Sequence, residues 1–136
     1  FTMRPFEPEY SPYRLANENS NVYFTFWDGQ SWSKARRLDS GTAFGPSHVD
    51  IAVDADGLTH IVWSKYDSYS KRYSIYYTMS DGKQESETVL IWRSDQDQES
   101  FPILKPIIIV DSLGKVTICF EAHIGGFWHS YITTNP

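Results

Sequence analysis

The hydrophobic positions of this chain fall in short runs that turn signals separate. Apolar and aromatic runs of a strand's length alternate with Asp-Gly pairs, and no stretch shows a convincing helical period. This pattern predicts about nine strands and almost no helix. We expect the strands at residues 21–27, 32–38, 49–53, 58–65, 73–79, 87–92, 106–110, 115–121 and 127–133.

Two parts of this pattern occur twice. Residues 51–63 read IAVDADGLTHIVW and residues 108–120 read IIVDSLGKVTICF, which align without gaps at an offset of 57 residues. Residues 22–29 (VYFTFWDG) and 75–82 (IYYTMSDG) align at an offset of 53 residues. Repeats of roughly 40–55 residues with several strands per unit are typical of β-propellers and similar arrays.

We therefore expect an all-β chain that forms a partial β-propeller of four-stranded antiparallel blades. Residues 1–20 would be an extended lead-in, and residues 21–136 would form the blades. Within them, 21–39 would end one blade, 49–92 would form a full blade, and 106–133 would supply three strands of the next. Roughly two and a half blades are too few to close a ring. A piece of a longer protein or an assembly of copies is expected. The alternative fold is a single β-sandwich of about nine strands.

Composition and charge narrow the function classes. Aromatic residues make up 16% of the chain, which suits half-buried strands. The net charge of −5 argues against a general electrostatic grip on nucleic acid or on anionic membranes. No apolar run approaches the roughly 20 residues of a membrane-spanning helix. Cys119 is the single cysteine and excludes an internal disulfide, and the first residue, Phe1, suggests a trimmed product.

The repeated segments resemble the blades of the BNR, or sialidase-like, propeller superfamily. The resemblance rests on residues 23–32 (YFTFWDGQSW), on residues 76–82 (YYTMSDG) and on the stretch from Pro46 to Trp63, and it covers residues 21–133. The family's Asp box, S-x-D-x-G-x-T-W, is altered here because Asp28 and Gly29 are adjacent. The resemblance implies structural roles for the Asp-Gly turns. Without a Phe-Arg-Ile-Pro segment, no catalytic arginine is carried over from family sialidases.

Candidate ligand-binding residues follow from the strand directions. In a blade, the tight turns lie on one side, and the strand 1 entry, the 2–3 loop and the strand 4 exit lie on the other. Propellers generally bind ligands on that second side, where the loops are longer. The candidates there, which a glycan or other small polar ligand would meet, are His48, Asp50, Tyr66, Arg72, Lys105 and His123. His48 and Lys105 are equivalent at the 57-residue offset. The alternative is ordinary loop polarity.

The remaining motifs predict no metal site and no cofactor. The four histidines have no metal-ligand spacing, and His60 in the middle of a strand is expected to be a satisfied core histidine. No nucleophilic-serine or nucleotide-binding motif occurs, and catalytic residues stay unassigned.

Three functions follow as hypotheses. The first is a carbohydrate-recognising propeller module, lectin-like or part of a glycan-processing protein, because tyrosines and polar residues gather in the predicted loops. The second is a sialidase-like glycoside hydrolase or a polysaccharide lyase whose active site other blades complete. The third is a structural or protein-binding scaffold. We expect an extracellular or periplasmic location, with self-association or further blades of the same protein as partners.

Overall fold

The computed structural model describes residues 21–39, 46–67, 70–94, 105–124 and 126–134. Within these ranges the chain forms nine β-strands and no helix, so the prediction of an all-β chain is confirmed. The strands are β1 (Tyr23–Phe24), β2 (Arg36–Arg37), β3 (Pro46–Val53), β4 (Thr59–Asp67), β5 (Arg72–Ser80), β6 (Val89–Arg93), β7 (Ile107–Val110), β8 (Val116–Ile124) and β9 (Phe127–Thr134). None of the described residues belongs to a helix that could cross a membrane.

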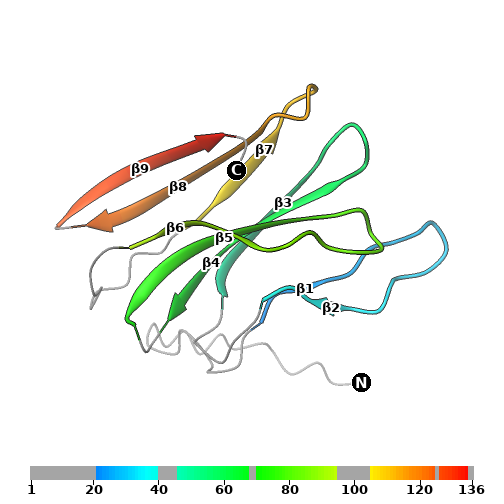
Figure 1. The fold of residues 1–136 in the computed structure, drawn as a ribbon, viewed down its shortest axis with the longest axis horizontal. Helices are drawn as coiled ribbons and strands as arrows, with labels where there is room; N and C mark the ends of the chain where they lie inside the picture. Colours follow the sequence, from blue (N-terminus) through cyan, green and yellow to red (C-terminus); the bar gives the residue numbers. More distant parts are fainter. Residues whose placement is uncertain (1–20, 40–45, 68–69, 95–104, 125, 135–136) are drawn as a thin grey trace, which may run out of the picture.

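The described strands form three antiparallel sheets, each from strands that follow one another in the sequence. Their orders are β1-β2, β3-β4-β5-β6 and β7-β8-β9. Figure 1 shows the three sheets side by side, with β3–β6 in the middle. Every hairpin connects sequence neighbours, and the order of the strands is the one that the hydrophobic runs predict.

Three expected loops are shorter than the sequence predicts. Tyr66 and Arg72 lie on β4 and β5, where the ladder continues through the pairs Tyr66↔Tyr73 and Asp67↔Arg72. The rings of Tyr66 and Tyr73 are 4.7 Å apart, and this cross-strand aromatic contact extends the hairpin. His123 lies on β8 opposite Trp128, and His48 lies on β3 opposite Ser64. The placement of these four residues in loops was therefore wrong.

The first hairpin is less regular than predicted. Only Tyr23↔Arg37 and Phe24↔Arg36 form a ladder, and Trp27↔Trp32 adds one isolated bridge near the turn. The hydroxyl of Thr25 donates to the carbonyl of Ser33 at 2.8 Å, so side-chain contacts partly replace the ladder in this hairpin.

The middle sheet is packed on both faces. One face carries Val62, Ile75 and Tyr77, which are buried against residues of β7 and β8 such as Ile108 and Ile118. The other face carries Ile61 and Trp63, which are buried against Val22 and Phe24. Alternate residues of β4 thus enter different cores, as the period of a strand requires. The arrangement has three layers, whereas the expected alternative of a β-sandwich has two.

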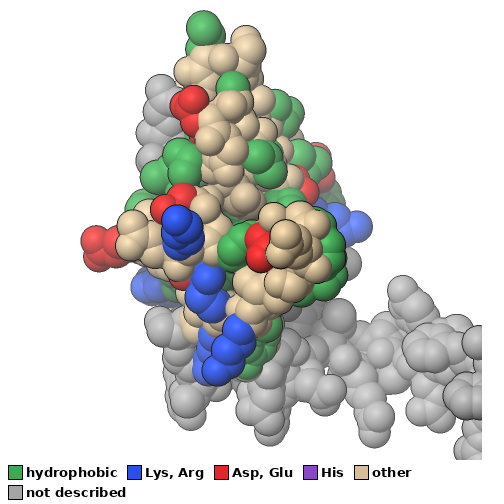
Figure 2. All heavy atoms as spheres, turned by 90° about the vertical axis from the view of Figure 1, so that its right-hand side faces the viewer, with side chains coloured by type: hydrophobic (Ala, Val, Ile, Leu, Met, Phe, Trp, Pro, Cys, Tyr) green, Lys and Arg blue, Asp and Glu red, His purple; other side chains and the backbone are tan. Residues whose placement is uncertain are grey.

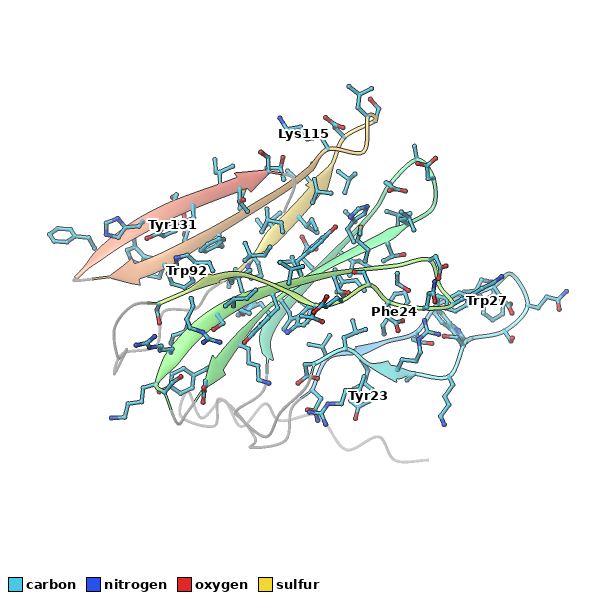
Figure 3. All side chains as sticks on the ribbon, in the orientation of Figure 1. Tyr23, Phe24, Trp27, Trp92, Lys115 and Tyr131 are labelled. Carbon is cyan, nitrogen blue, oxygen red and sulfur yellow. The ribbon has the colours of Figure 1, made fainter. Side chains whose placement is uncertain are left out.

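Aromatic side chains fill the core between β3–β6 and β7–β9. Trp92 of β6 lies 5.4 Å from the ring of Phe120 and 5.6 Å from that of Tyr131 (Figure 3). Phe120 and Tyr131 stack at 5.1 Å with nearly parallel planes. Aromatic pairs at such distances add about 0.5–1.5 kcal/mol beyond the area they bury. The three rings therefore contribute to holding the two sheets together.

The repeat in the sequence is also a repeat of hydrogen bonds. The carboxylate of Asp54 accepts from the backbone N–H of Leu58 at 2.9 Å, and Asp111 accepts from that of Lys115 at the same distance. The pair Asp28 and Asp81 caps the other two turns, where Ser31 N–H and Gln84 N–H donate to Oδ1 at 2.7 and 2.9 Å. The interpretation of these Asp-Gly turns as structural is confirmed.

The Asp-Gly turns gather at one end of the molecule, and the facing ends of β4 and β5 and of β8 and β9 lie at the other (Figure 1). Viewed from the turn end, hydrophobic side chains lie among both signs of charge, and Lys and Arg side chains gather in the lower half of the picture (Figure 2). We call the end with the Asp-Gly turns the turn end, and the end where β4 meets β5 and β8 meets β9 the loop end.

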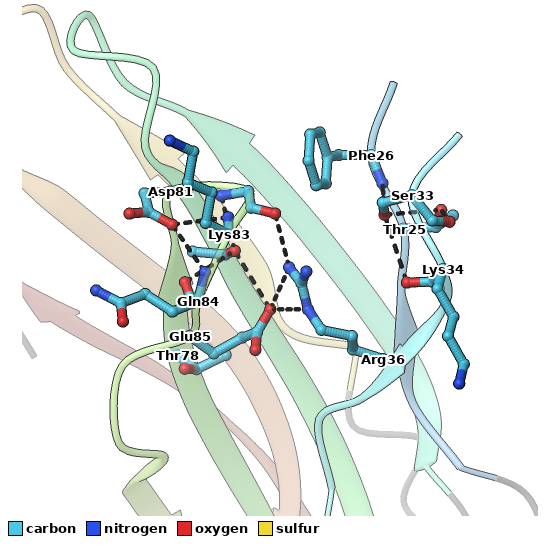
Figure 4. Close-up of polar contacts among 12 residues, drawn as sticks. Thr25, Phe26, Ser33, Lys34, Arg36, Thr78, Asp81, Lys83, Gln84 and Glu85 are labelled. Carbon is cyan, nitrogen blue, oxygen red and sulfur yellow. Dashed lines mark hydrogen bonds and ion pairs between the residues drawn. The ribbon is translucent and has the colours of Figure 1, made fainter. Parts of the chain in front are cut away.

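An arginine of the first sheet clamps a turn of the second. The Nε of Arg36 donates to the Glu85 carboxylate at 2.7 Å, and a terminal nitrogen donates to the carbonyl of Gly82 at 2.9 Å (Figure 4). The guanidinium also lies 5.8 and 5.9 Å from the ring centres of Phe24 and Phe26. The planar fork of arginine suits this combination of bidentate and stacking contacts. Arg36 therefore fixes how β1–β2 sits on β5–β6 near the turns.

Candidate functional site

The loop end holds two polar clusters on opposite faces of the middle sheet. The first contains the predicted residues His48, Asp50 and Lys105, between β3 and the start of β7. The second, which the sequence analysis did not predict, is built around Asp39 and Lys65, between the first sheet and the middle sheet. The two clusters are separated because His48 and Asp50 point to one face of β3–β6, whereas Trp63 and Lys65 point to the other.

In the first cluster, Asp50 joins two sheets. Its Oδ2 accepts a hydrogen bond of 2.9 Å from the backbone N–H of Ile108 on β7. β7 is an edge strand of its sheet, so this N–H has no acceptor on a neighbouring strand of that sheet. The Asp50 carboxylate accepts its hydrogen bond instead. Asp50 was predicted as a ligand-binding residue, and the structure gives it a contact between sheets.

Lys105 lies close enough to His48 to influence the charge of the imidazole. Partial burial lowers the pKa of His48, and the positive charge of Lys105 lowers it further. The Nδ1 of His48 is buried and has no hydrogen-bond partner among the described residues. Lys105 itself is exposed. The two residues that the repeat makes equivalent thus lie near each other, with the imidazole of His48 beside the positive charge of Lys105.

The other predicted residues lie apart on their own hairpins. Tyr66 is half-buried and stacks on Tyr73, and burial raises the pKa of Tyr73 to about 12, with a smaller contribution from Tyr66. Arg72 is half-buried at the start of β5. His123 is placed on β8 by its backbone, and its side chain lies outside the described residues. These three residues come from the β4–β5 and β8–β9 hairpins rather than from the entries of the first strands.

The second cluster surrounds a cavity of about 70 Å³ at the loop end. Its lining residues are Leu38, Asp39, Trp63, Lys65, Tyr76 and Thr88. The side chains of Asp39 and Lys65 are only 3% and 9% exposed, and the Lys65 ammonium lies 3.7 Å from an Asp39 carboxylate oxygen. A buried pair of opposite charges in a cavity wall is costly unless hydrogen bonds satisfy it.

Asp39 is held by its neighbours in the first sheet. Its Oδ1 accepts from the backbone N–H of Val22 at 2.9 Å and from the Nε of Arg37 at 3.3 Å. These two donors and Lys65 hold the carboxylate in one orientation. Asp39 directly follows Leu38, whose backbone N–H bonds to the Val22 carbonyl at 2.9 Å, so the end of the first hairpin positions the carboxylate.

Trp63 lines the same cavity and carries a buried indole N–H. Its indole is 1% exposed, and its Nε1 has no hydrogen-bond partner among the residues that the structure describes. The Trp63 ring stacks on Tyr76 at 5.8 Å. Buried indole N–H groups usually find a partner. The residues that line the cavity therefore combine the Asp39 carboxylate, the Lys65 amino group, the Trp63 indole and the Tyr76 ring.

His60 belongs to neither cluster. Its Nδ1 lies 2.8 Å from the hydroxyl of Tyr77, and its Nε2 lies 3.1 Å from Oδ2 of Asp54. The hydrogen bond from His60 lowers the pKa of Asp54, and burial raises the pKa of Tyr77. The prediction of a satisfied core histidine is confirmed. In the described part of the chain, no three His, Cys, Asp or Glu side chains lie close enough to hold a metal ion.

Comparisons with known proteins identify no relative of this chain. No protein-family model matches the chain, and neither the curated proteins nor the solved structures give a significant match.

Proposed function

We propose that the chain is a section of a β-propeller whose loop end recognises carbohydrate. The observation that carries the recognition proposal is the cavity where the buried Asp39–Lys65 pair meets Trp63 and Tyr76. Sugar rings have apolar C–H faces that suit aromatic side chains, and hydroxyls that both donate and accept hydrogen bonds. The cavity offers both kinds of partner within one wall.

The propeller part of the proposal is supported by the repeated packing. Equivalent residues of successive sheets pack on the sheet that follows. Val22 and Phe24 of the first hairpin pack on the middle sheet. Their equivalents at the 53-residue offset, Ile75 and Tyr77, pack on the third sheet. Stacking of equivalent sheets with equivalent turns at one end is the arrangement of propeller blades.

The size of the cavity limits which part of a sugar enters it. About 10–15 Å³ of such space holds one water molecule, so 70 Å³ holds a few waters or one projecting group of a ligand. A hydroxymethyl arm or a sugar carboxylate has that size, and the carboxylate would also meet the Lys65 ammonium. A binding role suits Asp39 better than acid catalysis, because three cationic or N–H donors already engage its carboxylate.

Binding of the full chain to an array of neutral and acidic glycans tests this proposal, followed by titration of the best ligand. Trp63→Phe keeps an aromatic ring and removes the indole N–H, so affinity should fall about 2- to 10-fold, the value of one hydrogen bond. Trp27→Phe changes an exposed tryptophan at the turn end and is the matched control, with affinity unchanged (Figure 3). An array without ligands, or binding that Trp63→Phe leaves intact, would contradict the proposal.

A further inference from the structure

The outer face of β7–β9 is apolar and uncovered. Ile107, Trp128 and Ile132 are 54%, 61% and 72% exposed, although each belongs to a strand of the sheet. Together with Cys119 they line a hollow of about 600 Å³, and Lys105 and Glu121 also belong to its lining. Exposed apolar faces of this kind mark interaction surfaces. We call this surface the socket.

The socket is the repeat of a face that is buried elsewhere in the chain. On the middle sheet, the cross-strand pair Val62 and Tyr77 is covered by β7 and β8. On the third sheet, the equivalent cross-strand pair is Cys119 and Ile132, because Cys119 corresponds to Val62 at the 57-residue offset. The middle sheet therefore shows what covers a face of this kind, namely the first strands of another sheet.

The same chain also carries an uncovered copy of the covering strand. At the 57-residue offset, Ile51 and Val53 of β3 correspond to Ile108 and Val110 of β7. Ile108 is 5% exposed because it packs on the middle sheet, whereas Ile51 is 55% exposed. The first hairpin packs on β4 and β5 and leaves β3 outside its core. We call the exposed row Val49, Ile51 and Val53 the plug.

We propose that two copies of this chain associate head to tail, with the plug of one copy docked on the socket of the other. The contact resembles the part of the internal packing that Ile108 of β7 makes on the middle sheet. β3 alone would supply the apolar row, because Ile61 and Trp63 of β4 already pack on the first hairpin. Because plug and socket are different surfaces, the contact is heterologous and leaves one plug and one socket free for further copies unless a ring closes. The proposal rests on the packing of sheets and does not depend on carbohydrate binding.

Solution mass as a function of concentration tests the association. The native chain should reach a mass of at least twice the 15.7 kDa of one copy at high concentration and return to one copy on dilution. Ile51→Asp removes the plug and Ile132→Asp removes the socket, and each alone should stay monomeric. Leu113→Asp, at an exposed leucine of the β7–β8 turn, is the matched control and should associate like the native chain.

Mixing the two single variants identifies the geometry. The Ile51→Asp copy keeps an intact socket and the Ile132→Asp copy keeps an intact plug. The mixture should therefore form a heterodimer of one copy of each variant, which cannot add further copies. Circular dichroism of both variants checks that the exposed substitutions leave the β-structure intact. A native chain that stays monomeric at every concentration overturns the proposal. Retained self-association of either variant, or a mixture that stays monomeric, overturns the head-to-tail contact.

Discussion

The carboxylate of Asp50 and the backbone N–H of Ile108 are joined by a 2.9 Å hydrogen bond that links β3 of the middle sheet to β7 of the third. The two residues are 58 positions apart in the chain. This bond ties the first strands of neighbouring sheets together at the point where their apolar faces begin to pack.

Removal of the Asp50 carboxylate should destabilise the fold. Asp50→Ala leaves a partly buried strand N–H without a partner, and hydrogen bonds to charged groups contribute about 1.5–3 kcal/mol. Asp50→Asn keeps an acceptor oxygen and should cost less than Asp50→Ala. Urea unfolding of the three proteins measures the order. Equal midpoints for the native protein and Asp50→Ala would show that the bond between the sheets adds nothing.

Two glycines of equivalent turns should respond differently to alanine. Gly29 and Gly82 have φ angles of +99° and +87°, so alanine is strained at both, at a cost of about 1–2 kcal/mol. A Cβ at Gly29 would meet nothing within 4 Å, whereas a Cβ at Gly82 would lie 3.3 Å from the ring of Phe26. Gly82→Ala should therefore lower the free energy of unfolding more than Gly29→Ala does.

The excess cost at Gly82 should depend on Phe26. In a Phe26→Leu background the ring is gone, so the difference between the two glycine substitutions should shrink, as coupled neighbours require. Denaturant unfolding of the double variants measures this coupling. A difference that Phe26→Leu leaves unchanged would place its origin elsewhere in the turn.

The pKa of His48 should rise when Lys105 loses its charge. Burial is the larger cause of the lowered pKa of His48 and the Lys105 ammonium the smaller, so Lys105→Met should bring the pKa only part of the way to 6.5. An NMR titration of the His48 ring reports this shift. Lys115→Met is the matched control, because Lys115 lies at the turn end (Figure 3). An unchanged His48 pKa in Lys105→Met would show that the Lys105 charge does not act on the His48 imidazole.

Acid should weaken the fold through the capped aspartates. The His60 hydrogen bond lowers the pKa of Asp54, and backbone N–H groups lower the pKa of Asp28 and Asp81. Below the ordinary Asp pKa of 3.8, these carboxylates bind protons in the unfolded chain but remain ionised in the native turns. The stabilisation is therefore complete above that pH and is lost as the pH falls through the lowered native values.

Urea unfolding between pH 7 and pH 3 measures this loss. Asp54→Asn should have lower stability at pH 7 and a shallower decline in acid than the native protein. Asp56→Asn changes an exposed residue of the same turn and should keep the native decline. A native protein equally stable at both ends of the range would contradict the assignment.

The strand order could be predicted from the sequence because an Asp followed within three residues by a Gly marks a turn between two apolar runs. Asp54 and Asp111 accept the same backbone hydrogen bonds, so local chemistry decides these turns. The strand ends near Tyr66 and His123 could not be predicted, because polar residues there remain paired through contacts across the hairpins. Ladder length depends on such cross-strand contacts more than on the polarity of single residues.

The cavity at Asp39 and Lys65 was missed because packing of two sheets creates it. Asp39 follows the first hairpin and Lys65 lies in β4, and no motif joins them. One signal was present: Lys65 continues the strand pattern that carries Ile61 and Trp63, where a charge needs a partner. The sequence predicted His48 and Asp50 from their place at the entry of a first strand, and Lys105, the equivalent of His48 in the repeat, lies near His48 in the structure.

Each sheet is a meander of successive strands, and this has a consequence for how the molecule acquires its structure. Closing a short loop costs little chain entropy, so a hairpin such as β4–β5 can form as soon as its two strands have left the ribosome. Contacts of large sequence separation, such as the one between Asp50 and Ile108, come afterwards and dock units that are already built. The chain is therefore suited to fold in the order of its synthesis, one meander after another.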